Sequence, residues 1–130
     1  MIPILRTNLN TFAFSVAYWP GGAIVLGRHA RYLAPTEVQA VLLHEEGHLV
    51  HRHALRRVWW VLSFQWRDLA DRCRRQELEA DRYAIDRGAA LGLHKFLARF
   101  PASHKNALHP TPGERIAHIY ETLRGISHGE

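Results

Sequence analysis

The chain has 130 residues, of which 47% are hydrophobic and 22% are charged, a composition typical of one folded domain and not of a disordered or fibrous protein. Lysine and arginine outnumber aspartate and glutamate by 17 to 12. Because the basic residues are scattered, we expect a solvated basic surface and no nucleic-acid partner. The single cysteine, Cys73, excludes an intramolecular disulfide and is interpreted as a buried, inert thiol.

Two strands and a turn are expected near the N-terminus. Residues 11–19 are rich in β-branched and aromatic side chains, residues 23–26 form a short apolar run, and Pro20-Gly21-Gly22 between them favours a tight bend. Thr36 and Gln39 form a capping-box pattern, and apolar residues then recur at helical spacing. This pattern predicts one helix from about residue 37 to residue 57.

Further helices are expected over residues 58–72, 74–86 and 91–100, with a loop over 102–110. Thr111, Pro112 and Glu114 then combine an N-cap, a proline at the first helical position and a capping glutamate, which predicts a last helix. No internal repeat or linker is evident. We therefore predict a single α+β domain over residues 1–130, mainly helical, with a small N-terminal β-hairpin.

No membrane-spanning segment is expected. The longest stretch without charged side chains, residues 7–27, is interrupted by proline and glycine and contains several polar residues. The segment after Arg6 also lacks the apolar core of a secretory signal, so we expect a soluble, cytoplasmic protein. For Trp59, Trp60 and Trp66 we expect core or dimer packing and not membrane contact.

The motif that carries chemistry is His-Glu-Glu-Gly-His at residues 44–48, in the middle of the first long helix. A spacing of four residues places the imidazoles of His44 and His48 on one helix face, where both can bind one metal ion. The carboxylate of Glu45 leaves the helix at a different angle, suited to reaching a water molecule on the metal. The motif predicts a metal site with Glu45 as general base.

A catalytic zinc site needs a third protein ligand and an open position for water. Glu77 and Asp81 lie four residues apart on one face of a later predicted helix. Glu77 is the candidate third ligand, and Asp81 is the candidate acceptor that orients a ligand histidine. Glu79 is the main alternative to Glu77 as the third metal ligand.

Four motifs occur in the order seen in a known family: residues 15–22, 44–57, 77–82 and 109–116. Together they resemble the soluble core of the HtpX-like and CAAX-prenyl-protease-like zinc metallopeptidases, in the compact form called minigluzincins. In that family the glutamate four residues before the aspartate is the third zinc ligand, which implies Glu77 and not Glu79. The resemblance also implies places near the zinc for His109 and Arg115, as candidates for steadying the oxyanion or closing the site.

The resemblance implies a zinc-dependent endopeptidase acting on a peptide or protein, with zinc on His44, His48 and Glu77. Two alternatives stay open: a regulatory peptidase of the ImmA and IrrE kind, and a metal-stabilised scaffold or binding module without turnover. For His51 and His53 we expect outward or core-capping roles and not metal ligation. Terminal segments such as 1–10 or 125–130 are candidates for blocking the active-site cleft. The sequence carries no signal for the oligomeric state.

Overall fold

A computed structural model describes residues 2–18, 21–100 and 109–127. The sheet consists of three strands, β1 (Ile4–Arg6), β2 (Ala13–Tyr18) and β3 (Gly21–Leu26), and a 3-10 helix, η1 (Arg28–Tyr32), follows it. The helices are α1 (Pro35–Val50), α2 (His53–Leu62), α3 (Leu69–Asp86), α4 (Ala90–Arg99) and α5 (Pro112–Ser127). The predicted α+β class with more helix than sheet is confirmed.

The N-terminal hairpin is present, together with a strand that the sequence did not indicate. β2 and β3 are antiparallel, with Ala13 opposite Leu26 and Phe14 opposite Val25. β1 pairs with β3 in the parallel direction, so the strand order is β1-β3-β2. β1 has only three residues, all exposed, and therefore shows none of the apolar alternation that marks a strand in a sequence. Trp19 and Pro20 of the predicted turn lie outside the described residues.

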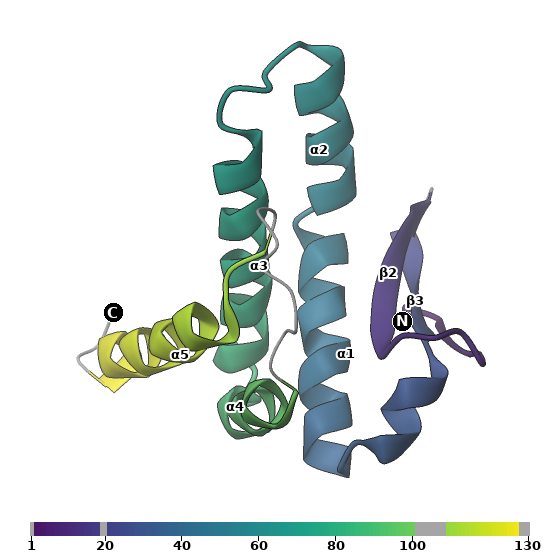
Figure 1. Ribbon diagram of the computed structural model, residues 1–130, viewed down its shortest axis with the longest axis vertical. Helices are drawn as coiled ribbons and strands as arrows, with labels where there is room; N and C mark the ends of the chain where they lie inside the picture. Colours follow the sequence, from purple (N-terminus) through teal and green to yellow (C-terminus); the bar gives the residue numbers. More distant parts are fainter. Residues whose placement is uncertain (1, 19–20, 101–108, 128–130) are drawn as a thin grey trace.

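Helices α1 and α3 stand side by side in the centre of the molecule (Figure 1). The sheet lies against one side of α1, and α4 and α5 pack near the lower half of α3 (Figure 1). The core lies where these helices meet and consists of Ala40, Ala84, Ile85, Ala89, Leu93, Leu97 and Ile119.

A glycine allows α1 and α3 to approach closely. A Cβ atom placed on Gly47 would lie 3.0 Å from the Cα atom of Ala80 and 3.0 Å from the Cβ atom of Tyr83. Ala40, Ala80 and Ala84 along the same contact are fully buried. Small side chains on both helices therefore bring the two backbones together near the middle of each helix.

The predicted helix over residues 37–57 is wrong in length. It is divided into α1 and α2, because Arg52 adopts the left-handed conformation, with φ of 54°. The predicted capping box at Thr36 is also wrong. Ala34 is the N-cap, Pro35 is the first helical residue, and the carboxylate of Glu37 accepts a hydrogen bond of 3.1 Å from the backbone N–H of Ala34.

The boundary between the next two predicted helices is misplaced as well. α2 ends at Leu62 and α3 begins at Leu69, and Phe64 in the connection has φ of 59°, which stops a helix. The later boundaries agree better with prediction. Gly88 follows α3 with φ of 86°, and the hydroxyl of Thr111 accepts a hydrogen bond of 3.1 Å from the backbone N–H of Glu114. The predicted loop falls mainly on residues outside those described.

Three tryptophans lie in α2 and in the connection to α3, and two of them are largely exposed. Trp59 is 63% exposed and Trp66 is 57% exposed, so neither packs in the core, and the other expected role, dimer packing, stays a prediction. Trp60 is partly buried, with the guanidinium of Arg72 over its ring at 5.1 Å. As expected, no helix in the described part of the chain is long and apolar enough to cross a bilayer.

Candidate metal centre

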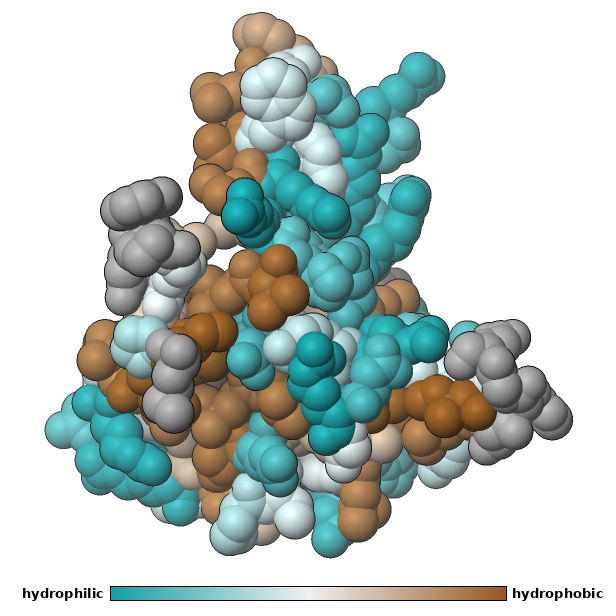
Figure 2. Space-filling view, turned by 180° about the vertical axis from the view of Figure 1, so that it is seen from behind, coloured by the Kyte–Doolittle hydropathy of each residue, from teal (hydrophilic) through white to brown (hydrophobic). Residues whose placement is uncertain are grey.

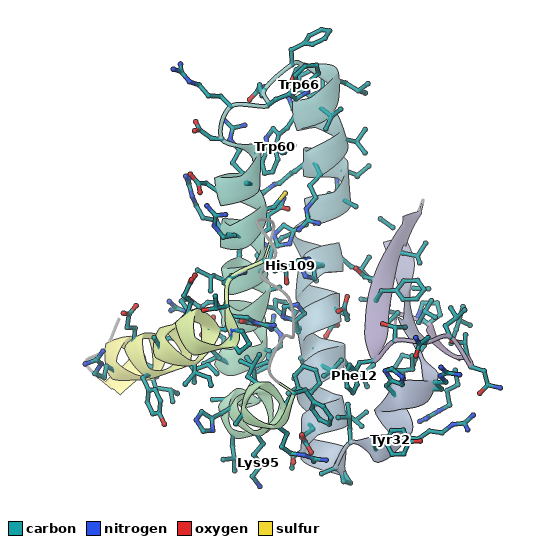
Figure 3. All side chains as sticks on the ribbon, in the orientation of Figure 1. Phe12, Tyr32, Trp60, Trp66, Lys95 and His109 are labelled. Carbon is teal, nitrogen blue, oxygen red and sulfur yellow. The ribbon has the colours of Figure 1, made fainter. Side chains whose placement is uncertain are left out.

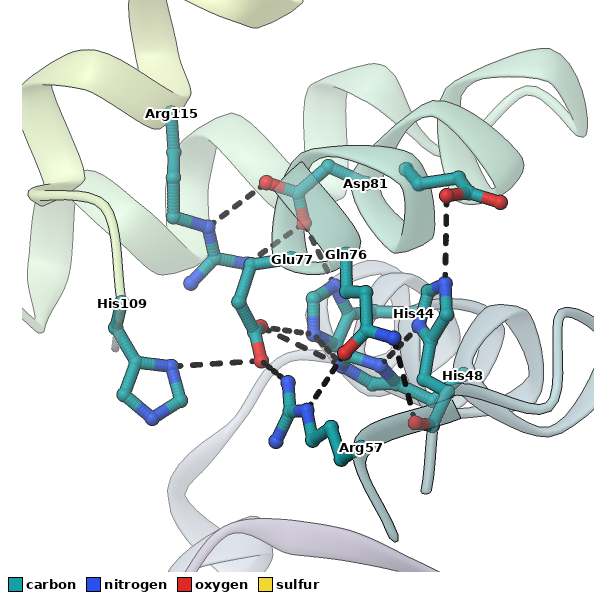
Figure 4. Close-up of polar contacts among 10 residues, drawn as sticks. His44, His48, Arg57, Gln76, Glu77, Asp81, His109 and Arg115 are labelled. Atoms are coloured by element: carbon teal, nitrogen blue, oxygen red, sulfur yellow. Dashed lines mark hydrogen bonds and ion pairs between the residues drawn. The ribbon is translucent and has the colours of Figure 1, made fainter. Parts of the chain in front are cut away.

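The two histidines of the central motif converge from α1, as their spacing predicts. Their Nε2 atoms lie 3.1 Å apart, and the rings meet edge to face. His44 is buried and His48 is partly buried. Figure 4 shows the two rings directed toward the same point beneath α3.

Glu77 of α3 completes the cluster. Its Oε2 atom lies 3.2 Å from Nε2 of His44 and 3.4 Å from Nε2 of His48. Its other oxygen, Oε1, faces Nη2 of Arg57 at 3.5 Å and Nδ1 of His109 at 3.4 Å (Figure 4). One carboxylate oxygen is therefore directed at the imidazoles, and the second is held by two other side chains.

The spacing of these atoms fits a divalent ion. Two ligand atoms at 2.0–2.1 Å from a tetrahedral zinc are roughly 3.3 Å apart, close to the three separations within the cluster. His44, His48 and Glu77 each offer one ligand atom, and these atoms lie within 4.8 Å of one another. Two imidazoles and one carboxylate form a donor set suited to catalytic zinc. Glu79, the competing ligand, is not part of this group among the described residues.

Asp81 supports His44 from the side opposite the cluster. Its Oδ1 atom lies 2.6 Å from Nδ1 of His44, and the carboxylate is fully buried. Arg115 of α5 donates two hydrogen bonds to Asp81, at 2.8 Å and 2.7 Å. Arg115 thus contacts the cluster through Asp81, and Asp81 lies beside His44, where an acceptor that orients this imidazole would have to lie.

Burial and charge act in opposite directions on these groups. Burial lowers the pKa of His44, but the negative charge of Asp81 and hydrogen bonds to Asp81 and Glu77 raise it to about 10. Burial raises the pKa of Asp81, yet the hydrogen bonds and charge of Arg115 together with His44 hold it at about 2. Burial likewise opposes ionisation of Glu77, but hydrogen bonds from His109, His44 and His48 keep its pKa far below the usual range. Without a metal ion the cluster therefore holds two charged carboxylates beside a protonated His44. The carboxylates attract a cation, and binding of that cation to Nε2 of His44 would release a proton.

His53 contacts the second histidine of the pair, a role that was not predicted. Its Nδ1 atom lies 2.8 Å from Nδ1 of His48, and the residue is 1% exposed. Burial, with nearby positive groups, lowers the pKa of His53 to about 3, so the ring is neutral and can accept a hydrogen bond. The left-handed Arg52 redirects the chain between these histidines, and five-residue spacing on a straight helix would not bring them together.

The remaining singled-out residues lie away from the cluster. Cys73 is a buried free thiol, as predicted. The Nδ1 atom of His51 lies 3.0 Å from Oε1 of Glu79, and neither belongs to the group of possible ligands. Glu79 also lies 3.5 Å from Nε2 of His53.

A cavity of about 440 Å³ opens over the cluster. Glu45 and His109 line it beside His44, His48 and Glu77, and Figure 3 labels His109 on the segment that leads into α5. The sheet contributes Ala13, Phe14, Ser15 and Ala17, all from β2. The sequence offered the segment 1–10 as a candidate for blocking the cleft. Residues 4–6 of this segment pair with β3 and do not line this cavity.

A mainly helical α+β chain with a two-histidine, one-glutamate cluster and a further glutamate in the same cavity has the construction of a zinc peptidase site. The model of peptidase family M48 matches residues 2–71, just over half of the chain, and the chain belongs to this family of zinc metallopeptidases. No curated protein and no solved structure matches the chain significantly. The matched region contains His44, Glu45 and His48 and ends before Glu77, so Glu77 is supported by the geometry.

Proposed function

We propose that this member of peptidase family M48 is a zinc-dependent endopeptidase of the HtpX-like, minigluzincin kind. The observation that carries the proposal is the triangle of ligand atoms from His44, His48 and Glu77. It lies in a cavity that Glu45 also lines. A cytoplasmic location and a single domain over residues 1–130 remain predictions from the sequence.

His44, His48 and Glu77 would hold the ion. When bound, zinc supplies a Lewis acid that polarises a carbonyl group and makes a water molecule more acidic. The carboxylate of Glu45 would accept the proton of the attacking water and deliver it to the leaving amine. Asp81 would fix the ring of His44 so that Nε2 keeps its lone pair toward the ligand cluster.

His109 is the candidate for stabilising negative charge on the substrate oxygen. It is half-exposed, lines the cavity and contacts the ligand candidate Glu77, so an imidazole N–H there can donate a hydrogen bond to an oxyanion. Arg115 donates two hydrogen bonds, from Nε and Nη2, to the carboxylate of Asp81. We therefore assign Arg115 a supporting role and not a contact with substrate.

The sheet offers a place for an extended substrate. β2 lies at the edge of the described sheet, with β3 as its only partner there, and its residues line the cavity together with Glu45. A peptide can add to such an edge through main-chain hydrogen bonds. This arrangement would present the backbone of a peptide or protein substrate to the cluster.

The test compares Glu45→Gln with the wild type and with Glu46→Gln, the neighbouring carboxylate on α1. We expect all three proteins to bind equal amounts of zinc, because neither glutamate is a ligand. Cleavage of casein or a fluorogenic peptide should fall by about 10²-fold or more only in Glu45→Gln, since the general base is lost. Zinc content is measured by atomic absorption on the same samples.

Two other outcomes would argue against the proposal. Zinc bound without cleavage by any of the three proteins would favour a metal-stabilised scaffold. Equal cleavage by wild type and Glu45→Gln would remove Glu45 as the base.

A further inference from the structure

Helix α2 exposes an apolar stripe that the rest of the described chain does not cover. Leu55, Val58, Trp59 and Leu62 follow the spacing of one helix face, and each is 54–68% exposed. The opposite face of α2 carries His53, which is buried, and Trp60, which is partly buried. In a globular domain such a stripe ordinarily faces the core, but here it faces away from α1 and α3.

The apolar surface continues beyond the end of α2. Val61, Phe64 and Trp66 are 45%, 78% and 57% exposed, and the rings of Phe64 and Trp66 lie 5.4 Å apart. We call the combined surface the tip patch; it consists of Leu55, Val58, Trp59, Val61, Leu62, Phe64 and Trp66. Figure 2 shows hydrophobic side chains along one side of the projecting α2–α3 hairpin, and Trp66 lies at its far end in Figure 3.

The residues around the tip patch are mostly basic, although the exposed Asp68 follows Arg67 and Glu79 lies 3.7 Å from Arg56. The segment from residue 47 to residue 67 contains four arginines and no aspartate or glutamate. Arg52, Arg56 and Arg67 of this segment are exposed. Exposed leucine, tryptophan and phenylalanine flanked by arginine are typical of surfaces that lie in the interface of an anionic bilayer.

We propose that the tip patch docks the protein on a bilayer surface that carries anionic lipid headgroups. The α2–α3 hairpin that carries the patch projects from the rest of the molecule (Figure 1), so the patch can contact a plane, whereas a protein partner would need a matching groove. A symmetric contact with a second copy would bring the arginine-rich segments near each other, which opposes association. With ten residues, α2 is too short to span a bilayer, so the contact is peripheral. This proposal goes beyond the peptidase activity and does not rest on it.

The experiment measures binding of the full chain to phosphatidylcholine vesicles with and without phosphatidylglycerol, by co-sedimentation and tryptophan fluorescence. Leu62→Glu is compared with Leu91→Glu, because Leu62 is 68% and Leu91 is 63% exposed and both variants change the charge equally. We expect binding to the anionic vesicles with a blue shift of the emission. Leu62→Glu should weaken vesicle binding by about tenfold or more. Leu91→Glu should leave the binding affinity within about twofold of the wild type.

Circular dichroism of both variants controls for folding. The proposal is overturned if the wild type does not bind anionic vesicles, or if both variants lose binding equally. It is also overturned if the wild type sediments as a dimer without lipid and Leu62→Glu makes it a monomer, since the patch would then be an interface between two copies.

Discussion

The two candidate ligand histidines are held in place by different partners. His44 contacts the carboxylate of Asp81, which Arg115 fixes in turn. His48 contacts His53, a neutral imidazole. Both contacts occupy the Nδ1 atom and leave Nε2 for the cluster, as metal-binding histidines require. His53 is therefore a positioning residue for His48.

Replacing His53 should weaken metal binding without removing a ligand. His53→Leu keeps much of the buried volume but leaves Nδ1 of His48 without its partner, so we expect zinc affinity to fall by about 10- to 100-fold. The dissociation constant is measured by competition with a chromogenic chelator. His51→Leu is the control, since His51 contacts Glu79 and not His48. Wild-type affinity in His53→Leu would show that His48 needs no such support.

The site depends on how closely α1 and α3 approach. Gly47 lies between the two histidines of the motif and faces Ala80 of α3, one turn of helix after Glu77. A larger side chain at residue 47 would separate the helices and carry Glu77 away from the imidazoles. The motif residues and the close contact are therefore parts of one arrangement.

Gly47→Ala tests this contact. We expect the free energy of unfolding to fall by about 1–2 kcal/mol, because the cost of overpacking exceeds the gain of up to about 1 kcal/mol in helix propensity. Gly113→Ala is the matched control in the first turn of α5, where an added Cβ atom meets only Oγ1 of Thr111 at 3.9 Å; this change should be neutral or stabilise by up to about 1 kcal/mol. Urea unfolding of both variants measures the difference, and a stabilising effect of Gly47→Ala would contradict the close approach.

At the break between α1 and α2, we expect a glycine substitution to increase the free energy of unfolding. Arg52 holds a left-handed conformation that is unfavourable for a residue with a Cβ atom. Arg52→Gly should therefore raise the free energy of unfolding by about 0.5–1 kcal/mol. Arg56→Gly, inside α2, should lower it by about 1 kcal/mol, and the two are compared by thermal unfolding. Destabilisation of equal size in both variants would argue for a continuous helix through residue 52.

Local signals in the sequence predicted much of the fold and of the cluster. The spacing of His44 and His48 predicted their convergence, and Thr111 with Pro112 predicted the start of α5. The break at Arg52 was missed because arginine has no special preference for the left-handed region, and His53 was missed with it. Periodicity identified apolar faces but not what covers them, so the exposed position of Trp59 could not be foreseen.

At the scale of the whole molecule, the packing of α1 against α3 predicts that the two helices together bind a single metal ion. Zinc stoichiometry is determined by mass spectrometry under native conditions for the wild type, Glu77→Gln and Glu79→Gln. We predict one zinc ion per chain in the wild type and in Glu79→Gln, and loss of bound zinc in Glu77→Gln, because Glu77 alone of the two lies within the ligand group. Zinc retained by Glu77→Gln and lost from Glu79→Gln would contradict the arrangement described for this site.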